Sequence, residues 1–90
     1  MVNILGILVI ALQILSMQIY IDPFGVAVVT MDVAITQGVN EIQLPVQPLV
    51  ESIEVTVGNE SLASVYSDGM LYVFSSVEGV AHISYLANIT

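Results

Sequence analysis

Residues 26–35 read VAVVTMDVAI, and apolar side chains alternate with polar ones over the second half of this stretch. Met31 and Val33 fall on one face of an extended chain, whereas Thr30 and Asp32 fall on the other. A repeat of two residues is typical of a β-strand with one buried face. This stretch therefore predicts a strand that packs one face against a core.

Further strands follow, because similar apolar runs recur about every 8–12 residues and are separated by turn residues. Asp68-Gly69 is a strong hairpin signal, since Gly tolerates positive φ. The additional predicted strands are Glu41–Leu44, Ser52–Val57, Leu62–Tyr66, Met70–Ser75 and Val80–Ala87. Together with residues 26–35, they predict a small antiparallel β-sandwich domain of about six strands over residues 26–90.

The run before this domain has a different composition. Residues 2–21 carry no charged side chain and few polar ones. Twenty residues of α-helix extend about 30 Å, which matches the core of a bilayer. The run also lacks the alternation of a half-buried strand. We therefore predict a mainly β protein with an N-terminal hydrophobic α-helix over residues 1–21. A hinge over 22–25 follows, with Asp22, Pro23 and Gly25 as its main residues.

A helix that is apolar on every face needs an apolar environment. A cleaved secretory signal normally begins with positive charges, and a single-span membrane anchor normally has Lys or Arg near its ends. The chain contains no Lys or Arg, so neither pattern is matched. A partner domain of about 65 residues is too small to bury such a helix within a monomer. Packing against further copies is the favoured interpretation, and a membrane anchor remains the alternative. One helical seam suits packing in a filament core or in a membrane oligomer, and consists of Asn3, Gly6, Ile10, Gln13, Met17 and Tyr20.

The charge of the chain excludes several classes of function. Eight of the 90 residues are Asp or Glu, one is His, and none is Lys or Arg. A nucleic-acid-binding surface needs cationic side chains that displace counterions from phosphates, so nucleic acid is excluded as a partner. The chain has no Cys. That composition excludes a disulfide framework, a thiolate nucleophile and a Cys-based zinc site.

Candidate catalytic residues are few. His82 has no second His and no Cys in the chain to join it. We expect it to be a structural residue on the strand face opposite Ile83 and Tyr85. Glu51 and Glu54 lie three residues apart, which puts them on opposite faces of any shared strand. No nucleophile-elbow or calcium-loop pattern is present. We therefore predict a protein that is not an enzyme and that uses no metal or cofactor.

Two acceptor patterns for N-linked glycans occur in the chain. Asn59-Glu60-Ser61 falls in a predicted turn, and Asn88-Ile89-Thr90 lies at the C-terminal end of the sequence. Both triplets lack Pro at the middle position, as the pattern requires. The sequence therefore predicts glycosylation at Asn59 and Asn88 if the protein is exported.

The combination of an apolar N-terminal helix and a small sandwich without Lys or Arg resembles archaeal type IV pilins and archaellins. In that family a peptidase removes a leader that carries the positive residues, and the mature chain begins in the helix. The stretch 39–90 resembles sandwich modules of archaeal cell-surface proteins. The segments that carry this likeness are Leu44-Pro45-Val46, Ile53-Glu54-Val55-Thr56-Val57 and Ser84-Tyr85-Leu86-Ala87-Asn88-Ile89-Thr90.

The resemblance implies a structural subunit of an extracellular, pilus-like filament that serves adhesion or surface attachment. Its partners would be further copies of itself in a helical homopolymer, with helices in the core and sandwiches outside. Before assembly the subunit would lie in the membrane. The alternative is a membrane-anchored archaeal envelope protein whose sandwich binds a protein or a glycan.

Overall fold

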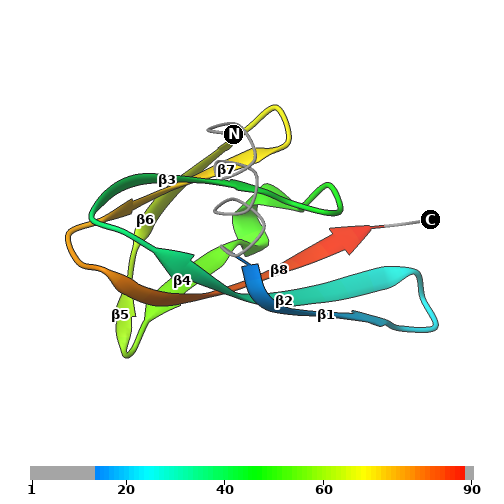
Figure 1. Ribbon diagram of the computed structural model, residues 1–90. Helices are drawn as coiled ribbons and strands as arrows, with labels where there is room; N and C mark the ends of the chain where they lie inside the picture. Colours follow the sequence, from blue (N-terminus) through cyan, green and yellow to red (C-terminus); the bar gives the residue numbers. More distant parts are fainter. Residues whose placement is uncertain (1–13, 89–90) are drawn as a thin grey trace, which may run out of the picture.

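The computed structural model describes residues 14–88, and over this range the chain forms two antiparallel sheets and one short 3-10 helix (Figure 1). The first sheet has the order β1 (Ile14–Ile21), β2 (Val26–Ile35), β8 (Gly79–Asn88), β4 (Glu54–Val57) and β5 (Glu60–Ser61). The second sheet has the order β3 (Gly38–Gln43), β7 (Met70–Ser75) and β6 (Ala63–Ser67). The 3-10 helix η1 spans Val50–Ser52. A strand is present at each of the six predicted places, as β2, β3, β4, β6, β7 and β8.

The core is built from the alternating side chains of these strands. β2 and β8 pair over ten residues each, from Val26 opposite Asn88 to Ile35 opposite Gly79. Every second residue of both strands is buried, as expected for strands with one face on a core. The largest fully buried side chains are Val29, Met31, Val33, Ile35, Ile42, Leu71, Val73, Ile83 and Tyr85.

Two tight turns fix the register of the hairpins. Asp68 and Gly69 both have positive φ, at 51° and 84°, and Ser67 pairs with Met70 on either side of them. This geometry is that of a type I′ turn, which the Asp-Gly pair predicts. Gly58 also has positive φ, at 59°, in the two-residue turn between β4 and β5.

The predicted N-terminal helix is wrong over residues 14–21, which form β1. This strand pairs antiparallel with β2, from Ile14 opposite Val33 to Ile21 opposite Ala27. The backbone groups of β1 that point toward β2 are therefore partnered by that strand instead of by a helical turn. Residues 1–13, the remainder of the predicted helix, lie outside the described part of the chain. Between residues 14 and 88 no α-helix is present.

The segment between β3 and β4 docks on the end of β8. The hydroxyl of Tyr85 donates a hydrogen bond to the carbonyl of Val46 at 3.0 Å, and the amide of Val46 approaches the same hydroxyl at 3.4 Å. Farther along, Leu49 donates its amide to the carbonyl of Leu86 at 2.8 Å. Burial raises the pKa of Tyr85. The Tyr85 contact thus holds the segment that follows β3 in place.

Candidate functional site

β1 is an edge strand with an unusual surface. All eight of its residues are exposed, and β2 is its only partner strand among the residues described. The strand carries no charge. Six of the eight side chains are large and apolar: Ile14, Leu15, Met17, Ile19, Tyr20 and Ile21.

One face of β1 points to the core side of the sheet and is nevertheless uncovered. Met17, Ile19 and Ile21 pair with Met31, Val29 and Ala27, all of which are buried. Cross-strand partners lie on the same face of a sheet. Yet Met17 is 41% exposed, Ile19 is 45% exposed and Ile21 is 57% exposed. The three-stranded sheet does not reach far enough to cover them.

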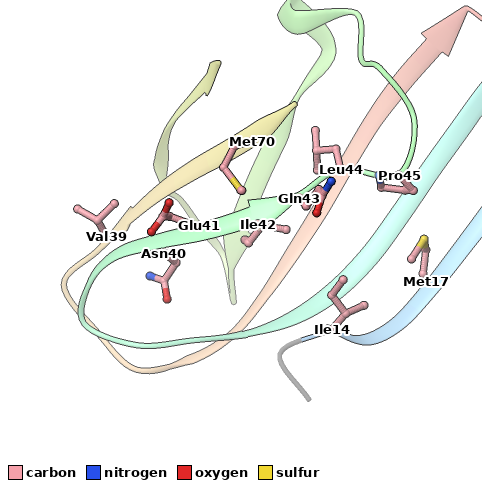
Figure 2. A pocket seen from close by; sticks show the side chains of 10 residues that line it. All are labelled: Ile14, Met17, Val39, Asn40, Glu41, Ile42, Gln43, Leu44, Pro45 and Met70. Carbon is pink, nitrogen blue, oxygen red and sulfur yellow. The ribbon is translucent and has the colours of Figure 1, made fainter. Parts of the chain in front are cut away.

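A groove lies between β1 and the edge of the three-stranded sheet. Its volume is about 860 Å³, and it is lined by Ile14, Met17, residues 39–45 and Met70. Figure 2 shows Ile14 and Met17 on β1 projecting toward the side where β3 lies. β3 is the first strand of its sheet and has one unpaired edge within the described structure. Apolar side chains and a free strand edge therefore meet in the same groove.

Edge strands usually carry features that prevent pairing with other chains, such as Lys, Pro or an inward-pointing charge. β1 has none of these side chains. Its single irregularity is a register shift between Ile14 and Ser16. The opposite edge of the same sheet is the two-residue strand β5, which is too short to offer much pairing. β1 is thus the least protected long edge of the five-stranded sheet.

The turn from β1 to β2 is fixed by Asp22. Its Oδ1 accepts the amide of Phe24 at 2.8 Å and the amide of Val26 at 3.1 Å. Gly25 donates its amide to the carbonyl of Asp22 at 3.2 Å and has φ of 85°, which favours glycine. Asp22, Pro23 and Gly25, predicted as a hinge, therefore form a hydrogen-bonded hairpin turn.

A polar cluster joins three strands on the outer face of the five-stranded sheet. Asp32 of β2 accepts a hydrogen bond from the hydroxyl of Ser16 in β1 at 3.1 Å. Its other oxygen lies 2.9 Å from Nδ1 of His82 in β8. The pKa of Asp32 is lowered, chiefly because His82 hydrogen-bonds to its carboxylate and secondarily because Ser16 does.

This cluster does not have the connectivity of a hydrolase triad. In a triad the histidine accepts the proton of the serine and the carboxylate supports the histidine. Here the carboxylate of Asp32 lies between Ser16 and His82 and contacts both. The cluster instead ties β1 to the two central strands. His82 is exposed on the face opposite the buried Ile83 and Tyr85.

The two described residues of the predicted helical seam lie on opposite faces of β1. Met17 lies opposite Met31 on the core side of β1, whereas Tyr20 lies opposite Val28 on the outer face. An offset of three residues puts side chains on opposite faces of a strand. The other seam residues, Asn3, Gly6, Ile10 and Gln13, lie outside the described residues.

The two predicted glycosylation sites lie on the surface. Asn59 is exposed in the turn between β4 and β5. Asn88 is the exposed last residue of β8. Asn59 is thus presented on a tight turn, and Asn88 at the end of a strand.

Within residues 14–88 no group of three or more His, Asp or Glu side chains is arranged to hold a metal ion. The same residues form no helix of the length and hydrophobicity needed to cross a bilayer. Comparison with protein-family models, with curated proteins and with solved structures found no match to this chain.

Proposed function

We propose that the protein is a structural subunit that assembles with further copies of itself through the surface of β1, in an extracellular filament. The observation that carries this proposal is the uncharged edge strand whose apolar side chains are exposed on both faces. Exposed contiguous apolar surface of this kind marks an interaction site.

The distribution of charge supports a contact between identical copies. All eight acidic residues lie after residue 21, and the chain contains no Lys or Arg. The net charge makes two copies repel each other, and the longest stretch without an acidic residue is the N-terminal 21 residues. Ion pairs between copies are limited to those of His82, so association depends on apolar burial and backbone hydrogen bonds.

The apolar surface of β1 is large enough to contribute substantially. Full burial of an aliphatic side chain stabilises by about 1.5–3 kcal/mol. Because the six large side chains of β1 are roughly half exposed, each contributes about 1 kcal/mol, or ~6 kcal/mol together. Association of two proteins costs about 4–15 kcal/mol. Burial of the β1 side chains alone therefore offsets only the lower end of the association cost, so a stable contact has to bury further apolar surface as well.

The presence of β1 in place of a helix changes how a filament would be held together. A helical core over residues 1–21 no longer applies, because residues 14–21 are part of the sandwich. The membrane-anchored alternative depended on the same twenty-residue helix and loses that support. The exposed acceptor pattern at Asn59 would be accessible to a glycosyltransferase if the protein is exported.

Electron microscopy and sedimentation of the native protein test this proposal. We expect filaments with a helical repeat in negative stain, and we expect them to persist in about 1 M NaCl, because salt screens the repulsion between acidic copies. A monomer under all these conditions would contradict the proposal. Dissociation by salt would show instead that ion pairs to a basic partner hold the material together.

A further inference from the structure

We propose that the groove between β1 and β3 accepts residues 2–12 of a second copy, which pair with the free edge of β3 and cover the core-side face of β1. This inference rests on the proposed self-assembly. The donor is the segment 2–12 of one copy, and the acceptor is the groove of another.

The geometry of the two sheets defines the acceptor. The first sheet has five strands and the second has three, in the residues described. Ile14 and Met17 of β1 line the groove together with β3, and Met17, Ile19 and Ile21 are exposed on the core-side face of β1. A strand added to β3 extends the smaller sheet in the direction of β1. It provides backbone partners for β3 and apolar side chains for β1, which is how strand addition achieves both affinity and specificity.

The chemistry of residues 2–12 fits this acceptor. They read VNILGILVIAL, with one polar side chain and no charge. A strand added to β3 turns one face toward β1, and an apolar run supplies the side chains that this face needs. Eleven residues are enough to pair with the six residues of β3. An uncharged donor also brings no like charge to the acceptor, whose β3 strand carries Glu41.

The sequence next to β1 favours a second copy over the same chain as the acceptor. Residues 7–21 contain no Gly, Pro, Asn or Asp. These residue types favour tight reversals, and a chain that entered its own groove would have to reverse beside Ile14, which lines that groove. The proposed acceptor is therefore the groove of a neighbouring molecule.

Donor and acceptor are different surfaces of the molecule, so the contact is heterologous. Such contacts produce a ring or an open helical assembly, whereas a contact between two identical surfaces stops at a dimer. Each added subunit fills one groove and offers one donor segment. Growth by this mode therefore gives a ring or an open filament, and neither needs a core of α-helices.

Cysteine cross-linking tests the inference, because the native chain has no Cys. One chain carries an acceptor thiol on β3, as Val39→Cys or Gln43→Cys, and a second chain carries a donor thiol as Ile4→Cys, Leu8→Cys or Leu12→Cys. The two chains are assembled together, oxidised and analysed by mass under non-reducing conditions. The matched control acceptor is Val65→Cys on β6, the far edge of the same sheet, which is also exposed.

We expect disulfide-linked pairs of donor and β3 acceptor chains for at least one donor position, and none with Val65→Cys. An assembly that forms without any such link overturns this inference alone, while the proposed self-assembly stands. Equal linkage to Val65→Cys also overturns it. A chain with both thiols that links within itself shows that the segment fills its own groove. Failure of the unmodified chain to assemble overturns the proposed function as well.

Discussion

Replacing Tyr85 by Phe removes one hydroxyl from the core and leaves the ring in place. That hydroxyl donates to the carbonyl of Val46 at 3.0 Å, and the second contact, from the amide of Val46, is long at 3.4 Å. One good hydrogen bond contributes about 1 kcal/mol net. Val46 is only partly buried, so water can reach its carbonyl and the cost stays near that value. For a domain of this size, ~1 kcal/mol corresponds to a fall in Tm of about 4–8 °C.

Thermal unfolding followed by circular dichroism measures this change, with all proteins at one concentration because association adds to apparent stability. Tyr66→Phe is the matched control: Tyr66 also packs partly against the core, and its hydroxyl has no hydrogen-bond partner in the described structure. We expect its Tm to stay close to that of the native protein. An unchanged Tm for Tyr85→Phe, or an equal fall for Tyr66→Phe, would refute the role of the Tyr85 contact in holding the segment after β3.

Three further predictions concern the turns, the polar cluster and the surface. Gly69→Ala should destabilise by about 1–2 kcal/mol in urea unfolding, because φ at this position is 84°; a conserved midpoint would argue against the type I′ turn. The lowered pKa of Asp32 gives a stabilising contribution that is present above the ordinary value of 3.8 and is lost as pH falls through the folded value. The difference in unfolding free energy between the native protein and Asp32→Asn should therefore shrink on acidification from about pH 5 to about pH 2. A constant difference would show that the hydrogen bonds of Asp32 do not stabilise the fold. Intact-mass measurement of native material should show added sugar that disappears in Asn59→Gln, and the mass of the bare chain would remove the case for this glycan.

The sandwich follows from local signals, and for this reason its strands could be predicted. Alternation in residues 26–35 marks the buried face of β2, and Asp68-Gly69 specifies the turn between β6 and β7. These signals depend only on which side chains face the core and on which residues tolerate positive φ. They are therefore readable without knowledge of the partner strands.

β1 could not be predicted in the same way, because its two faces do not differ enough in polarity. A strand is recognised by a polar face, and here Ser16 and Gln18 are the only polar side chains apart from Tyr20 on that face, while the register shift at Leu15 breaks the alternation. An apolar run of twenty residues then resembles a helix. The missed signal was the turn at 22–25: an Asp, a Pro and a Gly directly before a clear strand also fit a hairpin, which requires a strand on both sides.

The sequence also does not predict the polar cluster of Ser16, Asp32 and His82. Ser16 and His82 are 66 positions apart in the sequence and meet only because β1 and β8 flank β2. A helix over residues 1–21 gives no reason to expect Ser16 beside Asp32. Strand order, which the sequence pattern does not specify, decides this contact.

If the apolar surface of β1 holds copies of this protein together, a charge placed on it should separate them, and the sedimentation of Ile19→Glu tests this most directly. Ile19 lies on the uncovered core-side face of β1, and Val65 on β6 is similarly exposed at 54%. Val65→Glu is therefore a control with the same added charge. We expect Ile19→Glu to remain folded by circular dichroism and to sediment as a monomer, while Val65→Glu sediments as the native assembly. An Ile19→Glu protein that assembles as the native protein does would contradict the claim.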